Sequence, residues 1–139
     1  MLMCISLLFI NALAEDEDNK NYSVNISEDK FLGSYLVNET GFTLYYNSND
    51  SESLGMSTCN DECAATWQPF YVEDPILPES LNFINFDSIK REDGSKQMTF
   101  KDWPLYLYSG DSSAGDVRGE GLEGDTWHVV DPMNHPELM

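Results

Sequence analysis

The sequence predicts a mainly β protein: a small antiparallel β domain of two pseudo-repeated hairpin or meander units, with one short helical turn. Two observations support this prediction. Short runs of β-branched and aromatic residues alternate with turns rich in Gly, Asn, Asp and Ser, as is typical of antiparallel strands. The same order of features then occurs twice, which indicates a duplicated unit. At 139 residues, the chain is long enough for one domain with its own core.

The repeat is visible in the spacing of matching residues. Three pairs lie at almost the same distance along the chain: Leu44 and Leu105 (61 residues), Asp50 and Asp111 (61), and Trp67 and Trp127 (60). Each half has a turn, a Leu-Tyr step, an Asp loop, a variable loop and a Trp. Residues 34–132 are therefore expected to form one domain of two units, about 34–70 and 88–132, that share a single core.

In the first half, residues 35–46 predict a hairpin around a turn at 38–41, followed by a polar loop at 47–53. Residues 60–67 predict the helical turn, capped by Asn60 or Asp61 and ended by Pro69. The segment 68–87 contains three prolines and predicts irregular structure. Its apolar residues, Phe83 among them, are expected to pack on the body of the domain.

In the second half, residues 88–100 predict a hairpin with Asp93-Gly94 as its turn. Together with a strand at 105–108, this hairpin predicts a three-stranded meander. Five glycines between residues 110 and 125 indicate a loop, because glycine disfavours strand and helix interiors. Residues 127–130 predict a final short strand, and 133–139 a tail.

The N-terminal region predicts export. Residues 1–14 resemble a signal peptide, with an apolar run that ends in Ala12-Leu13-Ala14. Residues 15–33 are polar and acidic and predict a disordered tether. Cys4 stands before the apolar run, whereas a lipid-attachment cysteine should follow it. We expect a secreted or cell-surface location, and leave open whether the apolar run is cleaved or kept as an anchor.

The charge balance limits the classes of partner. The chain has 25 acidic and 7 basic residues, a formal net charge of -18. Such a surface repels nucleic acid and anionic membranes, and favours cations, basic partners or high salt. We expect an extracellular protein or glycan partner and no membrane insertion of the mature chain; the oligomeric state stays open. Four Asn-x-Ser/Thr sequons predict glycosylation: Asn21, Asn25, Asn38 and Asn49.

Cys59 and Cys63 are the two cysteines after the apolar run, and in an exported protein such a pair predicts a disulfide. The alternative is a Cu(I) or redox site, with thiolates supplied by both cysteines, an imidazole from His128 or His135, and Met56 nearby in sequence. The acidic residues between the cysteines do not favour a reactive thiolate, because they would not lower its pKa.

Two further groups of residues suggest chemistry but have simpler structural interpretations. Five acids in the glycine-rich loop could bind Ca²⁺, or could only form turns: Asp111, Asp116, Glu120, Glu123 and Asp125. Seven aromatic residues could stack on sugars, but their repeated positions favour a core: Tyr45, Tyr46, Trp67, Trp103, Tyr106, Tyr108 and Trp127. No nucleophile motif, phosphate loop or nucleotide fingerprint is present.

Several segments resemble one known family. Tyr106-Leu-Tyr-Ser-Gly-Asp111 matches the Tyr-x-aromatic-x-x-Asp motif of the secreted-repeat proteins of unknown function, which are predicted lipoproteins. The earlier copy keeps Tyr45 and Asp50 but has Asn47 at the aromatic position. The cysteine segment and the residues around Arg91, Trp103 and Gly119 also resemble this family, over about residues 34–132. The resemblance implies an exported protein whose molecular function is not established.

We therefore expect an exported, non-catalytic, cell-surface or secreted structural or interaction protein that needs no cofactor. The alternative is an extracytoplasmic metal-binding or electron-transfer accessory protein that uses Cys59, Cys63 and a histidine. An enzyme is the third hypothesis, since the many acids make some acid–base pairs inevitable. The sequence names no catalytic residue.

Overall fold

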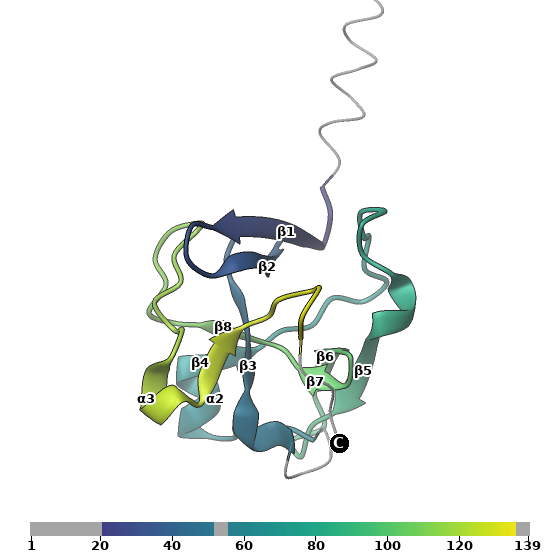
Figure 1. Cartoon of the computed structure of the whole chain (residues 1–139). Coiled ribbons are helices and arrows are strands. Elements are labelled where there is room, and N and C mark those ends of the chain that lie inside the picture. Colours follow the sequence, from purple (N-terminus) through teal and green to yellow (C-terminus); the bar gives the residue numbers. More distant parts are fainter. Residues whose placement is uncertain (1–20, 52–55, 136–139) are drawn as a thin grey trace, which may run out of the picture.

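The computed structural model describes residues 21–51 and 56–135, and these form three antiparallel sheets with short helical segments (Figure 1). The signal peptide predicted at 1–14, residues 15–20 of the predicted tether and the end of the tail lie outside the described residues. The mainly β fold class is confirmed. The elements are β1 (Val24–Asp29), β2 (Gly33–Asn38), β3 (Leu44–Asn47), η1 (Ser48–Ser51), α2 (Glu62–Thr66), β4 (Trp67–Pro69), η2 (Phe83–Asn85), β5 (Phe86–Lys90), β6 (Lys96–Phe100), β7 (Trp103–Pro104), β8 (Tyr106–Tyr108), α3 (Leu122–Asp125) and β9 (Trp127–Val129).

The central sheet joins the two units strand by strand. Its order is β4-β8-β3-β9, with Tyr45 of β3 opposite Tyr106 of β8 in the middle. The outer strand of each unit pairs with the inner strand of the other unit: β4 with β8, and β9 with β3. The sequence repeat is thus a pseudo-twofold arrangement in space, and neither unit forms its half of this sheet alone.

The prediction of a disordered tether over 15–33 is wrong for the part that the structure describes. Residues 24–29 form β1, which pairs along its whole length with β2. Val24 is fully buried in the core, and Ile26, two residues on, packs against the same cluster. Alternating apolar residues within a polar stretch indicate a half-buried strand, and this short signal is what the prediction overlooked.

The turn of the hairpin predicted at 35–46 forms, but the strands on either side diverge. The Asn38 side chain accepts hydrogen bonds from the Thr40 and Phe42 N–H groups, which fixes the turn. Beyond one isolated bridge between Val37 and Thr43, β2 pairs with β1 while β3 enters the central sheet.

The predicted β5–β6 hairpin is confirmed, and the Arg91 N–H bonds to the Ser95 carbonyl across its turn. The third strand of this meander is β7, not the predicted strand at 105–108. Residues Tyr106–Tyr108 instead become β8 in the central sheet. Pairing between the two units has therefore replaced the local meander.

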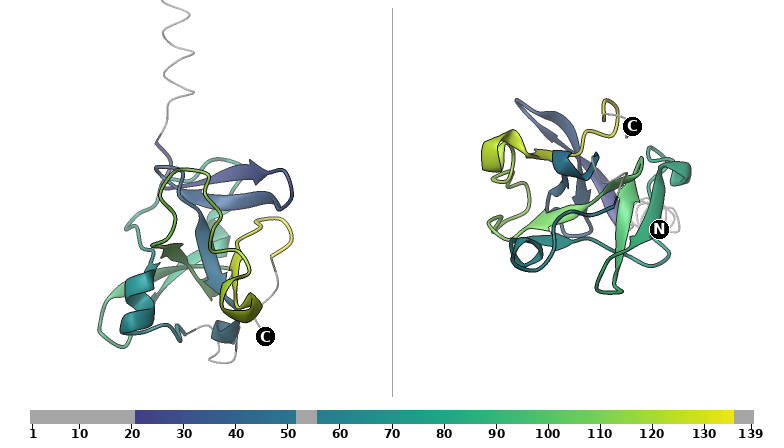
Figure 2. Two further views of the ribbon diagram at one scale, coloured as in Figure 1. Left: turned by 90° about the vertical axis from the view of Figure 1, so that its left-hand side faces the viewer. Right: turned by 90° about the horizontal axis from the view of Figure 1, so that it is seen from below.

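Five of the seven aromatic residues considered above are buried, and the other two, Tyr46 and Tyr108, are half-buried and pack against the core. Trp67 and Trp127, which occupy matching repeat positions, are each 1% exposed, and their rings stack in parallel with centroids 3.8 Å apart. Tyr45 and Tyr106 lie beside them, fully buried. A second, mainly aliphatic cluster fills the space between the central sheet and the two smaller sheets seen around it in Figure 2.

Candidate functional site

The tyrosine and aspartate of the repeated motif form two crossed pairs. The Tyr45 hydroxyl of the first unit donates a hydrogen bond to Asp111 of the second unit at 2.7 Å. The Tyr106 hydroxyl of the second unit donates to Asp50 of the first at 2.8 Å. In each motif, the tyrosine donates a hydrogen bond to the other unit and the aspartate accepts one from it.

Each aspartate also holds a loop of its own unit. Asp50 accepts hydrogen bonds from the N–H and hydroxyl of Thr58, and Asp111 accepts one from the Arg118 N–H. Burial raises the pKa of both aspartates, while the hydrogen bonds oppose that rise because they favour the charged carboxylate. Burial raises the pKa of Tyr45 too, so its hydroxyl stays protonated. The tyrosines and aspartates of the motif therefore have a structural role, because they hydrogen-bond to one another inside the core.

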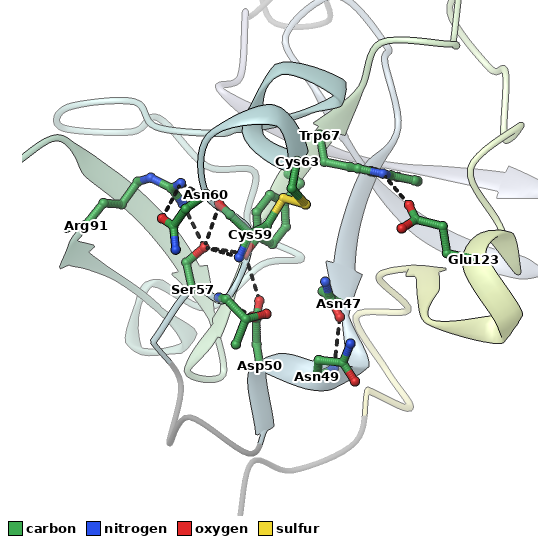
Figure 3. Close-up of a disulfide and its surroundings, with 12 residues drawn as sticks. Asn47, Asn49, Asp50, Ser57, Cys59, Asn60, Cys63, Trp67, Arg91 and Glu123 are labelled. Atoms are coloured by element: carbon green, nitrogen blue, oxygen red, sulfur yellow. Dashed lines mark hydrogen bonds between the residues drawn. A yellow bond between two sulfur atoms is a disulfide. The ribbon is translucent and has the colours of Figure 1, made fainter. Parts of the chain in front are cut away.

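Cys59 and Cys63 form a disulfide, with Cα atoms 5.2 Å apart, at the start of helix α2 (Figure 3). This bears out the predicted pairing. The bridged sulfurs supply no thiolates, so the oxidised pair seen here offers no Cu(I) ligands and favours the structural interpretation. The buried Cys59 packs instead with the aromatic cluster around Trp67.

Sequence reasoning missed Arg91, because a cation beside a hairpin turn is usually exposed. Here it is 5% exposed, and its guanidinium donates to Ser57, Gln97 and the Cys59 carbonyl. Ser57 in turn lies 2.6 Å from the Tyr106 hydroxyl, which donates to Asp50. A buried cation and a buried carboxylate are thereby joined through two hydroxyl groups, with the disulfide loop held between them (Figure 3).

The two histidines lie in different surroundings. His128 bonds to Glu120 through Nδ1 at 2.6 Å and to the Asp125 carbonyl through Nε2 at 2.8 Å. Donor atoms of Glu120, Asp125 and His128 lie within 4.8 Å of one another, so these three residues could hold a divalent cation. Both ring nitrogens of His128 have protein partners here. His135 is packed among the rings of Tyr46 and Trp103.

The five acids considered for Ca²⁺ do not converge on one point. Apart from the Glu120–Asp125 pair beside His128, each has its own partner. Asp111 binds Tyr45, Asp116 accepts bonds from Ser112 and Ser113, and Glu123 accepts one from the Trp67 indole. These contacts support the interpretation that the acids of this loop stabilise its turns.

The predicted sequons all lie at one end of the sequence. Asn21 and Asn49 are exposed, whereas Asn25 and Asn38 are half-buried. The Asn38 side chain is engaged in its turn. Glycosylation stays a prediction at all four.

A groove lies beside β5. It has a volume of about 180 Å³ and is bounded by the segment after β4, by η2 and by the β5–β6 hairpin: Tyr71, Val72, Asp74, Pro75, Phe83, Phe86, Asp87, Ser88 and Met98. Phe83 and Ile84 are 60% and 83% exposed, and Ile76 is 57% exposed. The expectation that Phe83 packs on the body is therefore wrong, while Phe70 and Leu81 of the same segment are buried.

These features define a duplicated β domain whose two halves are fastened together by crossed hydrogen bonds. The family model for a secreted repeat of unknown function matches residues 29–71 and again 87–131. The chain belongs to this family, so it is an exported, extracytoplasmic protein. Searches of curated proteins and of solved structures gave no significant match. No helix within the described ranges has both the length and the apolar character needed to cross a membrane.

Proposed function

We propose that this chain is a non-catalytic interaction domain that binds a partner protein outside the cell. One observation carries the proposal: exposed apolar side chains occur at a groove and in the chain segments that form it, while the polar residues of the repeat are buried in pairs. Phe83 lines this groove at 60% exposure, and Ile84, its neighbour in the chain, is 83% exposed. Exposed apolar residues that gather at a concave surface are typical of protein interaction sites.

The distribution of polar groups argues against catalysis. The residues with the strongest chemistry, Asp50, Asp111 and Arg91, are buried and bonded to other side chains within the core. A general acid or base must instead lie within reach of a substrate. Glycan stacking is also disfavoured, since Trp67 and Trp127 are buried against each other.

A photoreactive amino acid at position 84 tests this function in the native host. We expect irradiation to yield a discrete adduct with an extracytoplasmic protein. The matched control is position 31, because Phe31 is equally apolar and 89% exposed but lies in the β1–β2 turn. Equal adducts from both positions, or none from position 84, would contradict the proposal.

A further inference from the structure

The groove lies along a sheet edge. The order β5-β6-β7 leaves β5 outermost, and no strand in the described part of the chain pairs with its other side. Figure 1 shows β5 at the margin of the molecule. Such an edge presents backbone N–H and C=O groups that an added strand can bind.

The hydrogen bonds of the hairpin show which residues of β5 face outward. At the two ends of the strand, the Lys101 N–H donates to the Asn85 carbonyl and the Arg91 N–H donates to the Ser95 carbonyl. Antiparallel pairing alternates from residue to residue, so the backbone groups of Phe86, Ser88 and Lys90 turn away from β6. The Phe86 N–H bonds to Phe83, and the Ser88 N–H bonds to the exposed Asp87 side chain. The carbonyls of these residues and the Lys90 backbone remain directed outward.

The side-chain surface continues along the same edge. The groove contacts Phe86, Asp87 and Ser88, and a second hollow begins at Ser88 and runs past Ile89 to Lys96. An extended segment on this edge would place alternate side chains over the first groove. There, Phe83 and Met98 provide apolar contacts.

Charge selects among the possible occupants. Asp74 and Asp87 line the first groove, whereas Lys90 and Lys96 line the second hollow, so the negative charge of this edge lies at its Phe86 end; the chain as a whole carries a formal net charge of -18. A second copy of this chain would bring the same negative charge, which disfavours self-pairing at this edge. A segment with Lys or Arg beside its apolar residue would gain attraction instead. All four sequons precede residue 50, so none lies in the segments that form the groove.

We propose that β5 binds an extended, cationic polypeptide segment by strand addition, with one apolar side chain of the segment in the groove beside Phe83. This inference rests on the proposed interaction function and names the partner chemistry of the same site. Main-chain hydrogen bonds would supply much of the affinity, and the groove would select the apolar residue.

The test is a binding titration of the full chain, labelled with ¹⁵N, with the heptapeptide Lys-Val-Lys-Phe-Lys-Val-Lys. We expect amide shifts concentrated at Phe86, Ser88 and Lys90, and weaker binding as salt rises. The same peptide with Glu in place of Lys, and one N-methylated at alternate residues, should lose binding. Shifts spread over the whole surface, or equal binding of the N-methylated peptide, would overturn strand addition.

Three variants locate the site. Phe83→Ser should weaken binding about tenfold through lost apolar contact, and Asp87→Lys should weaken it and reduce its salt dependence. Phe31→Ser, the matched exposed control, should bind like the unaltered chain. Photoadducts at position 84 without peptide binding would overturn only the strand-addition proposal, whereas peptide binding without adducts in the host would count against the proposed function.

Discussion

Tyr45 and Asp111, 66 residues apart in the chain, meet in the core at a hydroxyl-to-carboxylate distance of 2.7 Å. Tyr106 and Asp50 repeat this contact in the opposite direction. Because the donors and acceptors are exchanged between the units, the two contacts together tie each half of the molecule to the other. The repeated motif therefore holds the two units of the duplicated domain together.

Removing either hydroxyl should destabilise the fold. In Tyr106→Phe, the buried Asp50 loses one donor, and we expect the free energy of unfolding to fall by about 1–3 kcal/mol. Tyr45→Phe should have a similar effect through Asp111. Urea unfolding measures both, and Tyr35→Phe is the matched control, since its ring is also buried but belongs to the other strand pair. A double-mutant cycle with Asp50→Asn should show coupling; additive effects would contradict a direct bond.

The disulfide should make a modest contribution to stability. It closes a short loop of five residues, so replacing Cys59 and Cys63 together by Ala should cost about 2 kcal/mol. Chemical denaturation of the double variant measures this cost. The unaltered chain under reducing conditions is the control and should lose a similar amount, and unchanged stability in both would show that the bridge does not constrain the unfolded chain.

Gly119 should tolerate no side chain. A Cβ at this position would lie 2.8 Å from the rings of both Trp67 and Tyr45, so we expect Gly119→Ala to cost about 1–3 kcal/mol by overpacking. Near-ultraviolet circular dichroism should also change, because the stacked tryptophans must shift. The control is Gly33→Ala, where the Cβ meets open space and only its positive φ opposes the change. Its aromatic spectrum should stay the same.

His135 should make the fold sensitive to acid. Burial, followed by the nearby Lys101, lowers the pKa of His135 from its usual 6.5 to about 4. The folded state thus prefers the neutral ring, and its stability should fall as pH drops from about 6.5 towards 4, where the unfolded chain binds the extra proton. The difference in stability between the unaltered chain and His135→Phe isolates this effect from other titrating groups. An NMR titration that places His135 near 6.5 would contradict it.

Three features could be predicted from the sequence. The β5–β6 hairpin and the disulfide have local sequence signals, and the repeat is visible in the equal spacing of matching residues. Spacing shows that Tyr45 matches Tyr106, but it does not say whether each tyrosine bonds within its own unit or across to the other. For the same reason the sequence predicts that the strand at 105–108 joins the local meander: sequence proximity favours pairing between neighbouring strands, whereas the structure pairs β8 with β3 and β4. The exposure of Phe83 has no sequence signal at all, since a core and a binding surface use the same apolar residues.

The crossed pairing has a consequence for how an exported chain reaches its folded state. The sheet partners of β3 are β8 and β9, so the first unit cannot complete its hydrogen bonds until residues up to Val129 are available. Contacts between distant residues form slowly, because a large loop must close first. In a chain emerging in order from its N-terminus, the β1–β2 and β5–β6 pairs can therefore form early, whereas the central sheet is completed only when its last strand is available.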